Sequence, residues 1–465
     1  MILYGRNFLP AAVTYVTCSL AGGSNLKKYL IQNCELANFD TMTTSTAEIL
    51  VEGERIKKIA KKIDPPEDCE ILNADGMLAM PSFADCHTHL AQSVLKGPMD
   101  DYPITAWLVR LFGIEGIMTP EEVYYSSLLG CLTALRCGTT VINEMGGWEM
   151  LDDEVQAIRD SKLRATFGIS TTDLPENDAT PILSLDETMR RTEAVYKKVH
   201  GLDGRLKASV APAGLPAVSG RMAQELKKFA NERGIIFHTH LGEGKMETEN
   251  VAKAYGLGGE AEALEQLGIL DSRTLLAHSI WLSDRELDII AKSGANPVHC
   301  PCTNLKISDG IPKIAAMLKR GINVTIGCDG EASSSNRDMV REARLAAYLQ
   351  KGWTLDPTVL DAGTVYKMMT VNGARALGYT DLGELKEGNL ADFILVDMDH
   401  DIALLNPDYK LNNFLYAGDG HNVDTVFLNG EMLVRRGRFT FIDEEEVLAK
   451  AAPVIRGLNK KIKNL

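Results

Sequence analysis

The chain has 465 residues, of which 45% are hydrophobic and 24% are charged, and its formal net charge is −14. A chain of this length can bury a large core and suggests one large domain with a smaller one. The negative charge argues against nucleic acid as a partner, because phosphate backbones are bound by clustered Lys and Arg. No apolar run reaches the roughly 20 residues that cross a bilayer, so we expect no membrane partner either.

Nine cysteines are scattered over the whole length. Secreted disulfide frameworks usually have dense, even-numbered cysteines in a short chain. We therefore expect reduced thiols and a cytoplasmic protein. Residues 1–27 are partly apolar, but Arg6 is the only basic residue before the apolar part and Pro10 interrupts it, so they form a poor signal peptide. We treat them as an extension of unknown role.

Short β patterns follow at both ends of the chain. Near the start and again near the end, apolar runs are separated by turn residues, at Tyr29–Cys34, Ala47–Val51, Arg55–Ala60, Asp392–Asp397 and Val423–Leu428. This resemblance in style predicts a small composite β-sandwich built from residues 28–80 and 383–465. The second part also carries a C-terminal helix.

The middle of the chain, residues 81–382, alternates apolar β runs with amphipathic helical stretches. This α/β pattern, repeated over about 300 residues, favours a closed (β/α)8 TIM-like barrel. A doubly wound open sheet is the alternative, but no Gly-rich phosphate loop follows its first strand. The expected strands are Leu78–Cys86, Thr139–Glu144, Leu163–Ser170, Leu206–Pro212, Gly234–Leu241, Thr274–His278, Ala295–Cys300 and Ile322–Cys328.

Histidines gather at the carboxyl ends of these β runs, where barrel enzymes assemble their active sites. His87 and His89 end the first run, and in an extended strand residues two apart point the same way, so both can share one metal ion. The fifth run offers a third nitrogen from His238 or His240. His240 is nearer the barrel mouth, and we interpret the deeper His238 as an interior or supporting residue.

Three further strand-end residues complete the set. Glu243 follows His240 by three positions and can act as an acid or base, His278 ends the sixth run, and Asp329 follows the eighth. Alone, such an aspartate can cap a helix and such a histidine can be a core residue. Together they predict a metal site. Three imidazoles and a carboxylate suit Zn²⁺ or Fe²⁺ better than Mg²⁺ or Ca²⁺.

These residues resemble the amidohydrolase superfamily, in its branch of mononuclear-metal deaminases and chlorohydrolases. The resemblance extends over nearly all of the chain from about residue 28. It rests on PSFADCHTHLAQSVLKG, HTHLGE, LLAHSIWLSD, CPCTNLKISDG, TIGCDGEASSSNRDM and GELKEGNLADFILVD, in the order of that family.

The resemblance also implies a ligand set and roles. One divalent ion, Zn²⁺ before Fe²⁺, would be held by His87, His89, His240 and Asp329. Glu243, His278 and Asp329 would be catalytic: Asp329 takes a proton from water, Glu243 protonates the ring nitrogen, and His278 polarises the water or stabilises the tetrahedral centre. Two-metal relatives carry a lysine at the end of the fourth strand, whereas Lys207 lies near the beginning of this run, so we expect a single ion.

Within the branch, the chain looks most like methylthioadenosine/S-adenosylhomocysteine deaminases. Trp107 then falls where a ring contacts the purine and Glu115 where a carboxylate meets the ribose hydroxyls, although a core Trp and a solvated Glu are the plain alternatives. Asn304 is a third candidate for substrate binding. The resemblance further implies a homo-oligomer.

Two departures leave the substrate open. Ala213 stands where those deaminases carry a His that touches the base, and Ile169 lies near the position of an Arg that holds the substrate carboxylate. Ala213 and the segment Thr140–Glu144 look more like atrazine chlorohydrolase and triazine hydrolases. We predict hydrolytic deamination of an amino-substituted nitrogen heterocycle, such as an adenosine-type nucleoside or a pterin- or guanine-like base, with release of ammonia. Hydrolysis of s-triazine-like rings is the alternative, and a non-catalytic barrel scaffold is a remote one.

Overall fold

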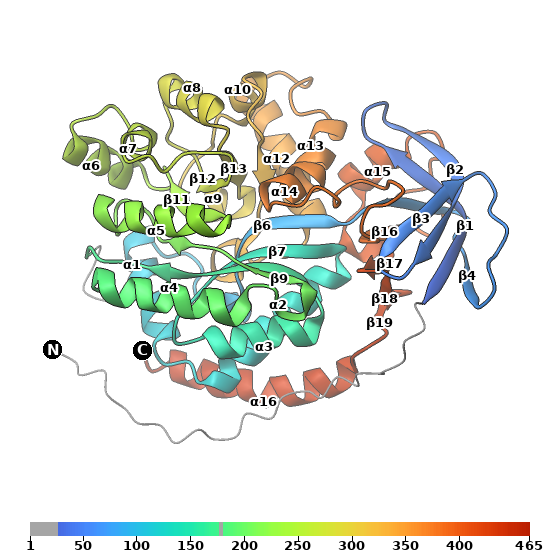
Figure 1. Cartoon of the computed structure of the whole chain (residues 1–465), viewed down its shortest axis with the longest axis horizontal. Coiled ribbons are helices and arrows are strands. Elements are labelled where there is room, and N and C mark those ends of the chain that lie inside the picture. The colour runs from blue at the N-terminus through green and yellow to red at the C-terminus, as the bar shows by residue number, and fades with distance from the viewer. Residues whose placement is uncertain (1–26, 176–179) are drawn as a thin grey trace.

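The computed structural model describes residues 27–175 and 180–465 (Figure 1). The predicted extension 1–27 lies outside the described residues, apart from its last position. Within the described part, no helix is both long enough and apolar enough to span a membrane.

A parallel β system lies at the centre of the larger body and has a TIM-barrel-like α/β fold (Figure 1). One sheet has the order β10-β8-β7-β6-β15, with β9 on β8, and the other has the order β11-β12-β13-β14. Val210 links the two sheets: its N–H donates to Ile236 O at 3.0 Å and its carbonyl accepts from His238 N at 2.8 Å. The strands are β6 (Phe83–His89), β7 (Thr139–Gly146), β8 (Arg164–Thr171), β9 (Leu206–Ala208), β10 (Ala211–Pro212), β11 (Phe237–Leu241), β12 (Thr274–His278), β13 (Asn296–His299), β14 (Thr325–Ile326) and β15 (Asp329–Gly330).

All eight predicted β runs contain strands, but the first run is corrected by the structure. Leu78–Cys86 is not one strand: β5 (Met77–Pro81) pairs antiparallel with β16 (Phe393–Asp397), and β6 begins after Ser82 and pairs with β7. A continuous apolar run reports burial on both faces, and it does not tell which of two sheets a strand joins. The chain therefore passes from one sheet to the other inside a single apolar run.

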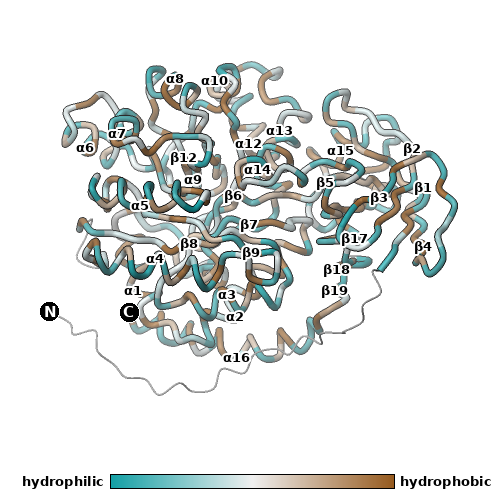
Figure 2. Tube along the Cα trace, viewed as in Figure 1, coloured by the Kyte–Doolittle hydropathy of each residue, from teal (hydrophilic) through white to brown (hydrophobic). Residues whose placement is uncertain are grey.

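Helices surround the parallel strands (Figure 1). Several begin at caps that the sequence encodes, such as the capping box of Thr119 and Glu122 at the start of α2 and that of Ser283 and Glu286 before α8. Along α4 the buried residues recur at helical spacing, and brown and teal alternate along its tube in Figure 2. The helices are α1 (Ile104–Glu115), α2 (Pro120–Arg136), α3 (Leu151–Ser161), α4 (Leu185–Val199), α5 (Gly220–Arg233), α6 (Lys245–Tyr255), α7 (Glu260–Gln266), α8 (Asp284–Ser293), α9 (Pro301–Lys306), α10 (Ile314–Lys319), α11 (Glu331–Ser334), α12 (Met339–Thr354), α13 (Ala362–Met369), α14 (Val371–Ala376), α15 (Lys410–Ala417) and α16 (Glu444–Ile462), with short 3₁₀ turns at Leu90–Gln92, Leu202–Gly204 and Gly420–Asn422.

Both ends of the described chain contribute to one nine-stranded sheet beside the barrel-like body (Figure 1). The order is β19-β18-β17-β16-β5-β1-β2-β3, with β4 paired to β1. Helix α16 then runs back and packs Val447 and Ala451 against Tyr124 and Tyr125 of α2. The remaining strands are β1 (Lys28–Asn38), β2 (Thr43–Glu52), β3 (Arg55–Ala60), β4 (Cys69–Asn73), β17 (Val423–Leu428), β18 (Glu431–Arg435) and β19 (Arg438–Phe439).

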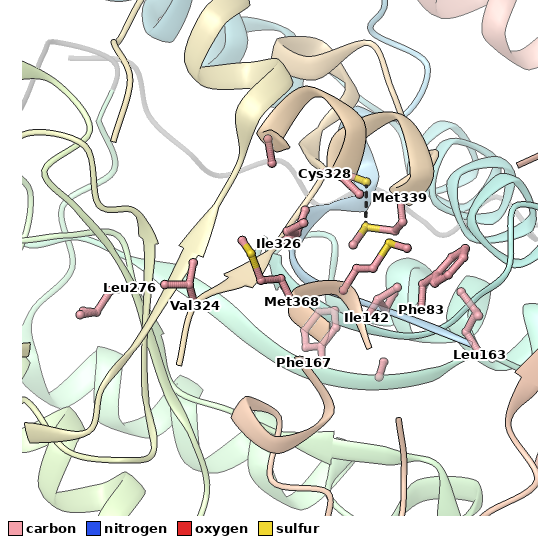
Figure 3. Close-up of a cluster of buried hydrophobic side chains, with 14 of the residues drawn as sticks. Phe83, Ile142, Leu163, Phe167, Leu276, Val324, Ile326, Cys328, Met339 and Met368 are labelled. Atoms are coloured by element: carbon pink, nitrogen blue, oxygen red, sulfur yellow. Dashed lines mark hydrogen bonds between the residues drawn. The ribbon is translucent and has the colours of Figure 1, made fainter. Parts of the chain in front are cut away.

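The largest buried cluster joins the strands to the helices around them. Figure 3 shows Phe83, Ile142 and Phe167, from three successive strands, in the same core as Met339 and Met368 of the late helices. Apolar burial of this kind contributes roughly 25 cal/mol per Å², so this core supplies most of the favourable folding energy.

A buried ion pair ties the parallel strands to the nine-stranded sheet. The Arg164 guanidinium of β8 contacts the Asp392 carboxylate, Nε to Oδ2 at 3.1 Å, and donates from Nη2 to Asn429 Oδ1 at 2.9 Å. The side chains of Arg164 and Asp392 are 4% and 0% exposed. Water therefore cannot replace either partner if the other is lost.

We predict that Arg164→Met destabilises the protein by about 3 kcal/mol, because it leaves the Asp392 carboxylate buried without its cation. The midpoint of urea denaturation measures this change. Arg190→Met is the matched control, since Arg190 is largely exposed and pairs with Glu187 on the same helix. A shift for Arg164→Met no larger than that of the control would contradict the assignment.

Candidate active site

Three strand ends bring the four predicted ligands together. His87 and His89 come from the end of β6, His240 from β11 and Asp329 from β15, which pairs with β6 at Thr88. One potential ligand atom from each of His87, His89 and His240 lies within 4.8 Å of the others, and the same holds for His87, His278 and Asp329. Asp329 Oδ1 is 3.4 Å from Nε2 of both His87 and His89. The sequence therefore predicted a group of side chains that do meet.

Hydrogen bonds at Nδ1 orient three of the imidazoles. Nδ1 of His89 lies 2.8 Å from Met145 O, Nδ1 of His240 lies 2.5 Å from Ala213 O, and Nδ1 of His278 lies 2.9 Å from Asn304 Oδ1. Because these oxygens can only accept, Nδ1 carries the proton in each ring. Nε2 is then the remaining nitrogen of each ring, and it carries a lone pair whenever that ring is neutral.

His87 supports a cation at this place. It is fully buried, and neither of its ring nitrogens has a hydrogen-bond partner. A buried polar atom without a partner is costly, and an imidazole nitrogen facing two other imidazoles and a carboxylate is what a divalent ion requires. The donor set therefore fits the divalent metal that the sequence predicts.

The deeper histidine of β11 lies outside these groups, as predicted. His238 is fully buried, its ring centroid lies 4.8 Å from that of His87, and its Nδ1 accepts from Asn143 Nδ2 at 3.0 Å. It supports the ring above it.

Glu243 and His278 lie beside the ligand group. Glu243 Oε1 is 3.5 Å from His278 Nε2, and one ligand atom from each of Glu243, His278 and His240 falls within the same 4.8 Å. His278, Ser279 and Asp329 have left-handed backbone, with φ of 67°, 52° and 63°. Such conformations cost of order 1–3 kcal/mol each and gather at active sites.

Burial and neighbouring charges set the protonation of the site. Burial drives the pKa of His87 well below its usual value and also lowers the pKa of His240, so both rings are neutral and available as ligands. Burial opposes ionisation of Asp329, but the surrounding imidazoles, His87 first, hold its pKa well below the ordinary value. Burial likewise opposes protonation of His278, but Glu243, Asp329 and the hydrogen bond to Asn304 together outweigh it and raise the pKa of His278.

The ligand group opens into a cavity of about 660 Å³. Trp107 and Glu115 both line this cavity, and Gln92 Nε2 donates to Glu115 Oε1 at 3.1 Å. Asn304 is different: it is fully buried, is absent from the cavity wall, and contacts His278 instead. The structure thus places Asn304 behind a predicted catalytic residue and not against a substrate.

Sequence reasoning missed several polar residues of this site, among them Gln92, Glu154, Ser170 and Arg337. Gln92, Glu154 and Ser170 line the cavity, while Arg337 lies behind the ligands, 3.6 Å from Asp85 Oδ2. Asp85 in turn accepts from the backbone N–H of Cys328 at 2.9 Å. The only sequence signal was position: Gln92 and Ser170 stand at or just beyond the carboxyl ends of predicted strands.

The fold and the gathered ligands define a metal-dependent hydrolase of the TIM-barrel-like class. A family model described as "Amidohydrolase family" matches residues 78–433, and the chain belongs to this family. The protein is accordingly a hydrolase that acts on C–N bonds. This excludes the alternative of a non-catalytic barrel scaffold.

Named relatives agree with this assignment. The chain is 32% identical over 410 residues to a 5′-deoxyadenosine deaminase of Methanothermobacter thermautotrophicus, with 87% of this chain and 93% of the relative covered. It is 32% identical over 430 residues to a 5-methylthioadenosine/S-adenosylhomocysteine deaminase of Pyrococcus furiosus, with 92% and 100% covered.

Solved structures have the same fold. An adenosine deaminase from Xanthomonas campestris with bound zinc gives a TM-score of 0.86 at 25% identity over 94% of this chain and 99% of that one. An atrazine chlorohydrolase from Arthrobacter aurescens TC1 in complex with zinc gives 0.85 at 22% identity, over 92% and 100%. At that identity the second comparison supports the fold alone.

We predict that the purified protein holds one divalent ion per chain and that His240→Ala loses it. Removing a ligand should cost more than the roughly 10–100-fold in affinity that follows loss of a supporting hydrogen bond. Elemental analysis after dialysis against a chelator measures the change. His421→Ala is the control, because this exposed histidine pairs with Asp419 away from the site. Full metal content in His240→Ala would refute the ligand set.

Proposed function

We propose that the protein removes the amino group of an adenine-type nucleoside by hydrolysis and releases ammonia. The observation that carries this proposal is the Glu243–His278 pair, 3.5 Å apart, beside a ligand group that opens into the cavity of Trp107 and Glu115. The relatives named as deaminases of 5′-deoxyadenosine and methylthioadenosine support the substrate class.

His87, His89, His240 and Asp329 hold the divalent ion in this proposal, and we favour zinc. The zinc in the adenosine deaminase of Xanthomonas campestris supports that choice. A cation of this kind lowers the pKa of a water molecule bound to it towards neutrality.

The proton movements follow from which atoms are free. Asp329 Oδ1 faces His87 and His89, whereas Oδ2 receives only a long contact from Ser333 Oγ at 3.3 Å, so Oδ2 takes the proton of the attacking water. Glu243 gives a proton to the ring nitrogen beside the carbon that bears the amino group. The water oxygen forms a bond to that carbon, the proton held by Asp329 passes to the amino nitrogen, and the C–N bond breaks with release of ammonia. The remaining hydroxyl proton returns to Glu243, which leaves a ring carbonyl and restores the acid.

His278 assists without exchanging atoms. Because Asn304 Oδ1 holds its Nδ1–H, a protonated His278 points Nε2–H towards Glu243 and the negative charge that develops at the attacking oxygen. We therefore assign Asn304 a positioning role. Trp107 stacks against the base, and the Glu115 carboxylate accepts hydrogen bonds from the sugar hydroxyls.

Hydrolysis of an s-triazine-like ring is the second candidate. Ala213, a small residue at the cavity wall, favours it, because it leaves room beside His240 for a bulky ring substituent. Release of ammonia from adenine nucleosides, compared with release of chloride from chlorinated triazines, separates the two functions.

We further propose how the chain is divided into domains. The links through Val210 and the β15–β6 pairing support one closed eight-membered barrel over residues 81–382, and the shared nine-stranded sheet supports a composite β-sandwich from residues 28–80 and 383–465. The eight cysteines of the described chain are free, which supports a cytoplasmic location. We also propose that the protein forms a homo-oligomer.

The decisive test of the chemistry is Glu243→Gln. This change removes the proton donor while keeping the side chain's shape, so kcat should fall by about 10²–10⁴-fold with the metal retained. Ammonia release and metal content are measured on the same sample. Glu249→Gln is the control, because Glu249 is exposed on α6, the helix that follows Glu243, and does not line the cavity. Unchanged kcat in Glu243→Gln would exclude this mechanism.

The buried carboxyl of Glu115 predicts that KM depends on pH. Burial raises the pKa of Glu115 to about 7, so the carboxyl is protonated below that pH and becomes a weaker hydrogen-bond acceptor. KM for a nucleoside with both sugar hydroxyls should rise as the pH falls below about 7, by up to about tenfold per pH unit. In Glu115→Gln, KM should be high and flat with pH. The same pH dependence in that variant, or for a 2′,3′-dideoxy substrate, would rule out the assignment.

A further inference from the structure

The wall of the active-site cavity is rich in acidic side chains. Its lining includes six of them, Glu115, Glu154, Glu243, Glu247, Glu260 and Asp329. Burial raises the pKa of Glu115 and of Glu260 to about 7 and that of Glu154 well above its ordinary value, so these three carboxyls are partly or largely neutral. Among the described residues that line it, there is no Lys and no Arg.

The cations nearest to this wall are engaged elsewhere. Lys245 lies over the ring of Trp281, with Nζ 5.3 Å from the centroid. Lys96 pairs with Glu331 at 2.5 Å, and Arg337 faces Glu331 and Asp85 behind the ligands. Reorienting Lys96 or Arg337 towards the cavity would leave Glu331 with one partner fewer, whereas Lys245 would lose its contact with the Trp281 ring.

Polar atoms on the Trp107 side lack partners in the protein. Trp107 Nε1 and Gln92 Oε1 are both buried without a hydrogen bond, and the Gln92 amide lies so close to Gly330 that a Cβ there would collide with it. Glu154 is 1% exposed, and a side chain at Gly146 would collide with its carboxylate. Trp107 Nε1 and Gln92 Oε1 are polar but uncharged, so neither supplies a positive charge on this side of the cavity.

An anionic group of a ligand would bind weakly on the Trp107 side of the cavity. A carboxylate or phosphate that enters the cavity loses water and meets acidic side chains with no Lys or Arg to pair with, so its lost hydration is not compensated and every ionised carboxylate repels it. A neutral group avoids that cost, and an ammonium gains from the carboxylates.

We propose that this cavity selects amino-heterocycles whose remote end is neutral or cationic and rejects those whose remote end carries a carboxylate or phosphate. The inference rests on the proposed deaminase function and narrows its substrate class. It also agrees with Ala213 standing at the cavity wall, at the position where the resembling deaminases carry a histidine.

Three substrates of nearly equal shape test the selection. They are 5′-deoxyadenosine, which is neutral, 5′-amino-5′-deoxyadenosine, which is a cation at neutral pH, and adenosine 5′-carboxylate, which is an anion. On the metal-loaded enzyme we expect kcat/KM of the cation to lie within about tenfold of the neutral compound. For the anion we expect kcat/KM to be lower by at least about 100-fold.

Binding measurements distinguish a failure of the charge selection from a failure of the proposed deaminase function. The same three compounds are titrated calorimetrically into metal-loaded Glu243→Gln. Selective binding without turnover in the native enzyme supports the charge selection and overturns the deaminase function. Equal binding and turnover of the anion overturns the selection and leaves the function intact. Failure of all three to bind overturns the substrate class, and the selection with it.

Adding a positive charge to the cavity wall tests whether charge is the cause of the selection. Ser170 is exposed at the cavity wall near the end of β8, so Ser170→Lys adds a cation there without replacing a buried residue. The kcat/KM of the anion relative to the neutral compound should rise at least about tenfold, and this ratio is independent of the folded fraction. Ser170→Met is the matched control for length without charge. An equal ratio in the two variants would show that charge does not set the selection.

Discussion

The orientation of the imidazoles by hydrogen bonds at Nδ1 is the constraint on which the site depends. The acceptors for His89 and His240 are backbone carbonyls of neighbouring segments, Met145 at the end of β7 and Ala213 after β10. A carbonyl fixed by a strand cannot rotate away, so each ring is held with Nε2 towards the common centre. The ligand geometry is thus a consequence of strand order, and the parallel sheet sets it before any ion is bound.

This arrangement costs folding energy. Two residues of the site that carry chemistry, His278 and Asp329, have left-handed backbone, and His87 is buried with both ring nitrogens unpaired. These costs persist because the strands beneath are fixed by a continuous apolar core from Phe83 to Met368 (Figure 3). A bound cation repays part of the cost by satisfying His87, which links metal binding to stability.

The sequence predicted the ligand group because two rules are strict. Side chains alternate along strands, and parallel strands present their carboxyl ends at one edge, so His87, His89, His240 and Asp329 could be placed together without coordinates. Asn304 could not be placed in this way, because its direction depends on how α9 meets β12. Glu154 lay in the first turn of α3, where acids are common because they complement the helix dipole, and nothing local marked it as a cavity residue. The split of Leu78–Cys86 was invisible because both halves are buried.

Charge is distributed differently on the two sides of the ligand group. Behind the ligands, Arg337 is fully buried between Glu331 and Asp85, and Asp85 holds the backbone N–H of Cys328 next to Asp329. Burial raises the pKa of Asp85 to about 6, and the guanidinium opposes that rise. In front of the ligands, no Lys or Arg of the described cavity wall plays this part. Beyond protonated His278, the positive charge that the cavity needs must therefore come from the metal ion and from the substrate.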